Sequence, residues 1–199
     1  MERAMKITLI VLVCGLLIWA TVGWGATRYL YTIHNTLTLT GTSNVSLTGI
    51  TQDRHLTGTF TDPQQGTWSF HERGRTDTRL PISGMSVTAQ GINDRDQVVG
   101  HVFRGCENIS FRYHGSAVTD YEGVGWDLQT MDLNNDGTEV GTYRPAGDPD
   151  YWCYWREHQG PLNPWRWVEG QPCRVHDITE ARDMGGSYLS PNGREHGWV

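Results

Sequence analysis

Beyond residue 30, apolar residues recur along the chain in short runs rather than on one face of a helix. No long segment keeps an apolar period of 3.6 residues, so the pattern predicts little helix. Runs of Thr, Val, Trp and Tyr are separated by Gly, Pro, Asn and Asp, which is typical of short strands joined by turns. The pattern therefore predicts an all-β fold.

Four stretches of the chain share one arrangement of apolar, turn-forming and glycine residues. Each stretch begins at an apolar residue, called position 0 below, and the four beginnings are 42, 41 and 45 residues apart. The stretches are ITQDRHLTGTF (50–60), INDRDQVVGHVF (92–103), LNNDGTEVGTY (133–143) and ITEARDMGGSY (178–188). This recurrence predicts a structural unit of about 40–45 residues, repeated along the chain.

Three positions of the repeat have a physical interpretation. Position 1 holds a residue that can bond its own backbone in a turn: Thr51, Asn93, Asn134 and Thr179. Position 8 is always glycine, which indicates a crowded place or a bulge: Gly58, Gly100, Gly141 and Gly186. An aromatic residue follows each glycine by 11 to 13 residues: Phe70, Phe111, Tyr154 and Trp198. Each unit is thus predicted to be a turn followed by two packed strands.

A unit of this length is that of a four-stranded propeller blade. The fourth unit stops at Val199 after about half a blade, and residues 29–49 alternate Thr with apolar residues as the missing half would. We therefore predict a small β-propeller of about four blades, with its ring closed by N- and C-terminal strands, because closure removes exposed edges. An open β-repeat stack is the alternative.

The first 25 residues differ from the rest of the chain. A short basic start precedes an apolar run over residues 7–20, as in a signal peptide. We expect residues 1–25 to be a cleaved signal peptide or, if uncleaved, an N-terminal membrane anchor. Residues 26–199 would then form a single β-repeat domain in the periplasm or outside the cell, with the membrane as a partner only through an uncleaved first segment.

Charge and cysteine content narrow the possible partners. The chain has a net charge of −6. Residues 1–25 have a net charge of +1, so the exported part would have a net charge of −7 and no excess of basic residues to attract nucleic acid. The three cysteines of this part, Cys106, Cys153 and Cys173, allow one disulfide and match no zinc motif. Cys153–Cys173 is the preferred pair because both residues are taken to lie in one unit.

Residues 132–137, DLNNDG, fit the opening of an EF-hand calcium loop. The twelfth position of such a loop requires glutamate, but the chain has Tyr143 there. At most, Asp132, Asn134 and Asp136 would hold a weakly bound calcium ion, and no other cofactor is expected. The other units do not repeat this set of ligands, which favours the alternative that residues 135–137 only form a turn.

Residues 151–170, YWCYWREHQGPLNPWRWVEG, hold four tryptophans and include an insertion in the third unit. Exposed indole rings beside polar groups suit a carbohydrate, and binding residues gather in such insertions. The candidate ligand-binding residues are Trp155, Trp165, Arg166 and Trp167. Trp152 and Tyr154 stand at repeat positions and are expected in the core of the blade.

The sequence carries little evidence of catalysis. No nucleophile elbow or HExxH motif occurs, and no catalytic residue is predicted. Two carboxylates could converge at the centre of a propeller for glycoside hydrolysis, but no pair stands out. We expect His55, His101 and His158 to be surface or turn histidines.

The core GINDRDQVVG (91–100), the strand SFRYHG (110–115) and the turn TDY (119–121) resemble the HAF family of extracellular repeats. Units of that family carry the core A-x-x-IN-D-x-G-x-V-V-G, a G-x-x-H-A-F-L-W-like strand and a T-D-L turn. The resemblance covers roughly residues 44–199, although Asp96 replaces the usual turn glycine and the first and last cores diverge. It implies an exported repeat protein without a defined activity.

These observations predict an exported binding or structural module. We expect loops on one face to contact a saccharide or a cell-envelope protein. The alternative is a hydrolase or lyase that acts on polysaccharide with the same fold. A binding module would retain a glycan unchanged, whereas an enzyme would release reducing ends.

Overall fold

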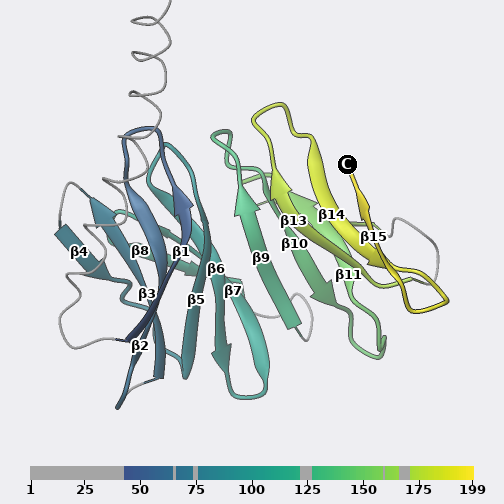
Figure 1. The fold of residues 1–199 in the computed structure, drawn as a ribbon, viewed down its shortest axis with the longest axis horizontal. Coiled ribbons are helices and arrows are strands. Elements are labelled where there is room, and N and C mark those ends of the chain that lie inside the picture. The colour runs from purple at the N-terminus through teal and green to yellow at the C-terminus, as the bar shows by residue number, and fades with distance from the viewer. Residues whose placement is uncertain (1–42, 65, 74–75, 122–126, 159, 166–170) are drawn as a thin grey trace, which may run out of the picture. The chain divides into compact units, whose positions relative to one another are not determined.

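The computed structural model describes residues 43–199 except 65, 74–75, 122–126, 159 and 166–170. All regular secondary structure in this part of the chain is β-strand, and the strands form four antiparallel sheets in chain order (Figure 1). The four sheets are arranged as the blades of a four-bladed β-propeller. The predicted fold class and the predicted number of blades are therefore confirmed.

Within each sheet, strands that are neighbours in sequence are also neighbours in space. The first sheet contains β1 (Ser43–Ile50), β2 (Leu56–Asp62), β3 (Gly66–Arg73) and β4 (Thr76–Arg79). The second contains β5 (Ser86–Ile92), β6 (Gln97–Arg104), β7 (Glu107–His114) and β8 (Ala117–Asp120). The third contains β9 (Asp127–Leu133), β10 (Glu139–Arg144), β11 (Trp152–Arg156) and β12 (Asn163–Trp165). The fourth contains β13 (Cys173–Ile178), β14 (Met184–Leu189) and β15 (Glu195–Trp198).

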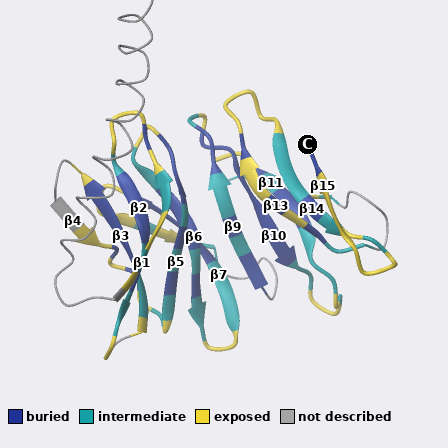
Figure 2. Cartoon of the chain, viewed as in Figure 1, coloured by how far each residue is buried: buried dark blue, intermediate teal, exposed yellow. Residues whose placement is uncertain are grey.

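The first strands of the four sheets, β1, β5, β9 and β13, contact one another in succession. From the second sheet onward, each first strand also packs against the second and third strands of the preceding sheet. The second and third sheets thus pack against a neighbouring sheet on both sides, because a small sheet cannot cover its own apolar residues. The buried residues accordingly lie on the strands that pack against a neighbouring sheet (Figure 2).

The turn after each first strand has the predicted construction. In all four units, the side chain at position 1 accepts a hydrogen bond from the backbone N–H four residues later. The pairs are Thr51 with His55, Asn93 with Gln97, Asn134 with Thr138, and Thr179 with Asp183, at 2.9–3.1 Å. Position 4 has a positive φ in every copy: Arg54, Asp96, Gly137 and Arg182. The recurring polar residues at position 1 therefore shape a turn.

The glycine at position 8 lies where no side chain fits. A Cβ atom on Gly58, Gly100, Gly141 or Gly186 would lie 2.2, 2.0, 2.1 or 2.1 Å from a carbonyl oxygen of the first strand. The register between the first and second strands also shifts next to this glycine in each sheet. Crowding and a bulge, the two explanations that the sequence left open, both apply.

The aromatic residue of each unit lies in the core. Phe70, Phe111 and Tyr154 are fully buried and Trp198 is nearly so, and the rings at positions 70, 154 and 198 lie beside the glycine of their own unit. One large apolar cluster is centred on the second sheet and another joins the third sheet to the fourth. The recurring spacing of glycine and aromatic residue in the sequence therefore results from this packing.

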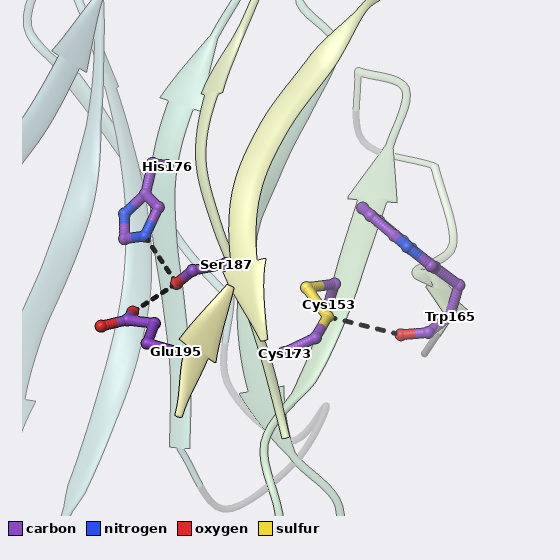
Figure 3. Close-up of a disulfide and its surroundings, with 6 residues drawn as sticks. All are labelled: Cys153, Trp165, Cys173, His176, Ser187 and Glu195. Atoms are coloured by element: carbon purple, nitrogen blue, oxygen red, sulfur yellow. Dashed lines mark hydrogen bonds between the residues drawn. A yellow bond between two sulfur atoms is a disulfide. The ribbon is translucent and has the colours of Figure 1, made fainter. Parts of the chain in front are cut away.

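One residue of the third strand ties each sheet to the next. Ser69 Oγ donates to the carbonyl of Val87 at 2.9 Å and accepts from the amide of Ala89 at 2.6 Å. Ser110 Oγ accepts from the amide of Thr130 at 2.8 Å. At the equivalent position of the third sheet, Cys153 forms a disulfide with Cys173 (Figure 3).

The predicted cysteine pair is therefore formed, but the reason given for it was wrong. Cys173 is the first residue of β13 and belongs to the fourth sheet, so the bond joins two blades rather than two parts of one unit. Cys106 is exposed and free.

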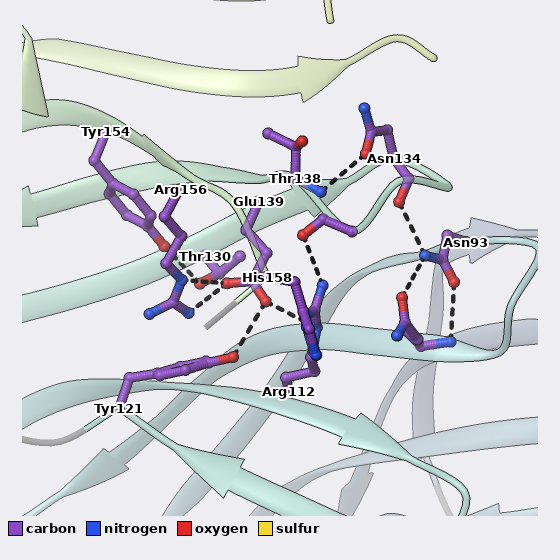
Figure 4. A network of polar contacts seen from close by, with 12 residues as sticks. Asn93, Arg112, Tyr121, Thr130, Asn134, Thr138, Glu139, Tyr154, Arg156 and His158 are labelled. Carbon is purple, nitrogen blue, oxygen red and sulfur yellow. Dashed lines mark hydrogen bonds and ion pairs between the residues drawn. The ribbon is translucent and has the colours of Figure 1, made fainter. Parts of the chain in front are cut away.

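A buried ionic cluster lies between the second and third sheets (Figure 4). Arg112 Nε on β7 lies 2.9 Å from Glu139 Oε1 on β10, and Arg156 Nε on β11 donates to Glu139 Oε2 at 2.6 Å. The Tyr121 ring packs against the Arg156 guanidinium at 3.2 Å, and its hydroxyl donates to Glu139. The three charged side chains are at most 4% exposed, so the cluster depends on their mutual pairing.

Two predictions fall on residues outside the described part of the chain. The signal peptide or anchor at residues 1–25 is one of them. The other is ring closure, because it calls for a strand from residues 29–42 beside the fourth sheet. Residues 43–49, the described end of that segment, belong to β1 of the first sheet.

Candidate functional site

A pocket of about 320 Å³ lies where the first strands of all four sheets come together. Its lining comes from the end of each first strand and the start of the following turn. Apolar residues at position 0 contribute one part of this surface: Ile50, Ile92, Leu133 and Ile178. Side chains that can form hydrogen bonds contribute the other part: Thr48, Gln52, Asn93, Asp94, Asp132, Asn135 and Glu180. We call this site the axial pocket.

The residue before position 0 differs between the two halves of the propeller. It is Gly49 and Gly91 in the first two units and Asp132 and Asp177 in the last two. A Cβ on Gly91 would lie 2.4 Å from Asp132 Oδ1, so this glycine makes room for the carboxyl group of the next blade. The two aspartates belong to neighbouring first strands, β9 and β13, and their carboxyl groups form a hydrogen bond.

The environment of Asp132 favours its protonated form. Burial and the hydrogen bond with Asp177 raise the pKa of Asp132 to about 8. The amide of Ile178 donates to Asp132 Oδ2 at 3.2 Å and partly opposes this shift. At neutral pH Asp132 therefore favours its protonated form, and its carboxyl group lies on a wall of the axial pocket.

A chain of hydrogen bonds links the four turns around the axial pocket. The residue at position 2 of one unit donates its backbone N–H to the side chain at position 2 of the next unit. The steps run from Gln52 to Asp94, from Asp94 to Asn135 and from Asn135 to Glu180, at 2.7, 2.8 and 2.9 Å. The bond from the Gln52 amide and a second bond from Asn135 Nδ2 lower the pKa of Asp94.

These contacts give the axial pocket a definite chemical character. Three carboxyl-bearing residues, Asp94, Asp132 and Glu180, line it, and no basic side chain of the described residues does. Such a wall accepts hydrogen bonds from hydroxyl or amine groups. Of the apolar residues at position 0, Ile92, Leu133 and Ile178 are buried and Ile50 is exposed, so the accessible surface of the pocket is mainly polar. An anionic ligand would be repelled.

Two of the four candidate ligand-binding residues lie in the described part of the chain. Trp155 and Trp165 are partly buried and pack against the apolar cluster that joins the third and fourth sheets. The Trp165 ring meets the edge of the Trp198 ring at 6.0 Å, and its carbonyl oxygen lies 4.0 Å from Cys173 Sγ (Figure 3). Arg166 and Trp167 lie outside the described residues. Neither Trp155 nor Trp165 lines the axial pocket.

The three residues considered for calcium have separate partners. Asp132 bonds to the fourth sheet, as described above. Asn134 Oδ1 accepts from the Thr138 amide and so closes its own turn. The exposed carboxylate of Asp136 lies 3.7 Å from Arg182. These contacts favour the interpretation of residues 135–137 as a turn.

A serine, a histidine and a carboxylate meet in the fourth sheet, but not in a catalytic order (Figure 3). Ser187 Oγ donates to Glu195 at 2.6 Å, and His176 Nε2 lies 3.2 Å from the same oxygen. Because the hydroxyl proton points to Glu195, the imidazole donates to the serine and does not act as its base. In a nucleophilic triad the carboxylate would orient the histidine instead.

The sequence missed Asp177 and the role of Asp132 at the pocket. The available signal was the residue before position 0, which changes from glycine to aspartate halfway along the chain. His55 lies at a turn as expected, whereas a ring nitrogen of His101 is buried, and this burial lowers the pKa of that residue.

Comparison with known proteins adds no relative. No family model, no curated protein and no solved structure matches the chain. Among the described residues, no helix is long and apolar enough to cross a membrane. The function must therefore be argued from the axial pocket itself.

Proposed function

We propose that this protein is an exported binding module whose ligand is a saccharide held in the axial pocket. The observation that carries the proposal is a pocket to which all four blades contribute, with a mainly polar surface that carries hydrogen-bond acceptors. Its volume of about 320 Å³ is at the lower end of the range for small-molecule sites. A sugar offers several hydroxyl donors to such acceptors.

The remaining parts of this proposal rest on the sequence. Export follows from the signal-like residues 1–25, and the repeat motif resembles that of HAF proteins. A glycan of the cell envelope would be within reach of such a protein, and so would an envelope protein that contacts the turns around the pocket.

A glycan array tests the proposal. The protein should retain a neutral or amino sugar, and Asp94→Ala should reduce its affinity at least about tenfold through loss of a charged hydrogen-bond acceptor. Asp53→Ala is the matched control, because Asp53 is an exposed carboxylate of the same type of turn that does not line the pocket. Retention that survives Asp94→Ala but is lost with Trp165→Ala would place the ligand on the tryptophan-rich insertion instead.

Hydrolysis of a glycoside is the second candidate, and the protonated Asp132 in the axial pocket is the observation that favours it. Asp132 lines the pocket, and its raised pKa lets it donate a proton to a glycosidic oxygen. Asp177 is hydrogen-bonded to Asp132 and does not line the pocket, so the group that activates water would be a different residue on the other side of the glycosidic bond. In a polysaccharide lyase, Asp132 would supply the same proton.

The two candidates differ in what happens to the bound glycan. An enzyme would release reducing ends from polysaccharide, and Asp132→Asn would stop the release while the glycan is still retained. A binding module would retain the glycan unchanged with either residue at position 132. Release at equal rates by the wild type and Asp132→Asn would exclude Asp132 as the proton donor.

A further inference from the structure

A second group of polar side chains lies between the first and second sheets, away from the Asp132–Asp177 pair. His55 precedes β2, His71 lies on β3, and Asp96 lies in the turn between β5 and β6. The Nδ1 atom of His55, the Nε2 atom of His71 and a carboxylate oxygen of Asp96 all lie within 4.8 Å of one another. Within the described residues, this is the one group of three or more His, Cys, Asp or Glu side chains placed closely enough to share a metal ion.

We infer that His55, His71 and Asp96 bind one divalent transition-metal ion, with zinc as the best match, between the first two blades. Two imidazole nitrogens and one carboxylate are a ligand set that zinc takes in proteins. Around a tetrahedral zinc ion, ligand atoms at about 2.0–2.2 Å from the metal lie about 3.4 Å from each other. The separation of His71 Nε2 and Asp96 Oδ1, 3.6 Å, is close to that value.

The state of His71 supports the site independently. Its side chain is 10% exposed, and its Nε2 atom is buried without a hydrogen-bond partner, although it faces Asp96. A buried nitrogen that bonds to nothing is costly, and a metal ion would satisfy it.

The other two ligands leave a path for the ion. The side chains of His55 and Asp96 are 17% and 18% exposed, so the group opens to solvent on one side. His55 Nδ1 and Asp96 Oδ1 are in direct contact, and the metal would take the place of the proton between them. Arg73 Nε lies 3.5 Å from the other oxygen, Oδ2, and its side chain is 72% exposed, so it can turn away into water.

The other blade interfaces show that the repeat architecture does not require this group. The equivalent residues between the second and third sheets are Gln97, Arg112 and Gly137, and between the third and fourth sheets they are Thr138, Trp155 and Arg182. Neither set can hold a metal ion.

Metal titration of the full chain tests this inference. After treatment with a chelator and its removal, the protein should bind one zinc ion per chain, measured by elemental analysis and calorimetry, and zinc should raise its melting temperature. Cobalt should bind at the same site and give visible absorption bands that report nitrogen and oxygen ligands. Less than one ion per chain at micromolar zinc would overturn the inference.

Variants identify the ligands. His71→Asn and Asp96→Asn should each weaken zinc binding at least about 100-fold, since even groups that only support a ligand are worth 10–100-fold. His114→Asn should bind as the wild type does, because His114 is an exposed histidine at the end of β7, outside the group. If His71→Asn does not fold in the presence of chelator, the zinc affinity of Asp96→Asn alone tests the site. Wild-type affinity in Asp96→Asn would overturn the site even if zinc binds elsewhere.

Discussion

Cys153 and Cys173 are joined at the place where the other blade interfaces have a serine hydrogen bond. Cys153 occupies the position of Ser69 and Ser110 on the third strand, and Cys173 occupies that of Val87 on the following first strand. The same spatial relationship is thus maintained by a hydrogen bond at two interfaces and by a covalent bond at the third. The fourth sheet has three strands in the described chain, and the disulfide ties its first strand to the third sheet.

The double variant Cys153→Ser, Cys173→Val should restore the serine arrangement and keep the fold. The disulfide closes a segment of 20 residues, so its loss should cost about 3 kcal/mol of unfolding free energy. Denaturant unfolding with and without reductant measures this. Wild type should lose stability on reduction and the double variant should not. Cys106→Ser, at the exposed free thiol, is the control and should behave as the wild type.

Glu139→Gln should destabilise the protein far more than loss of a surface charge. It leaves the buried guanidinium groups of Arg112 and Arg156 without their shared carboxylate (Figure 4), and breaking such a pair costs about 3–5 kcal/mol. Asp120→Asn is the control, because the Arg104–Asp120 pair is partly exposed and should contribute less than about 1 kcal/mol. Equal losses for the two variants, measured by urea unfolding, would contradict the dependence of the cluster on Glu139.

Gly100→Ala should disturb the second blade. The added methyl group would lie 2.0 Å from the carbonyl oxygen of Thr88 and 2.9 Å from the Ala89 Cα, and backbone atoms cannot move aside freely. We expect a loss of about 2–4 kcal/mol. Gly185→Ala is the matched control, since its nearest neighbour would be 3.9 Å away. A loss of less than about 1 kcal/mol for Gly100→Ala, as expected for the control, would show that position 8 is not crowded in solution.

The blades could be predicted from the sequence because their determinants are local and repeated. Asn93 shapes its own turn, and Gly100 is required by the strand next to it, so the same residues recur in each unit. The axial pocket is different. Asp132 and Asp177 lie 45 residues apart and meet only because their strands pack side by side, and the equivalent residues of the first two units are glycines. A comparison of the repeats for shared residues therefore does not identify Asp132 and Asp177.

The buried charge of Glu139 in the core could not be predicted from the sequence either. It stands at position 6, where the other units have Leu56, Val98 and Met184, so the repeat predicts an apolar residue there. The charge of Glu139 is tolerated in the core because it pairs with Arg112 from the preceding sheet. No residue near Glu139 in the sequence indicates this partner. Burial of a charge depends on contacts between blades, which the sequence pattern does not contain.

Asp132 should make stability depend on pH in the direction opposite to that of most carboxyl groups. Its pKa in the folded protein, about 8, is above the ordinary value of 3.8, so between these values the folded state binds more protons than the unfolded state. Stability from this group is therefore fully present below about pH 4 and is lost as the pH rises through about 8.

Comparison with Asp132→Asn isolates this effect, because other titrating groups are common to both proteins. The unfolding free energy of wild type minus that of the variant should fall by about 5 kcal/mol from pH 4 to pH 8, because each pH unit between the two pKa values is worth about 1.4 kcal/mol. Asp94→Asn is the control: the pKa of Asp94 is lowered from 3.8, so its difference from wild type should stay nearly constant over this range and change, with the opposite sign, only toward more acidic pH. A difference between wild type and Asp132→Asn that stays constant over this range would mean that Asp132 is ionised at neutral pH. The proton available for glycoside cleavage would then be absent, whereas the saccharide-binding proposal would stand.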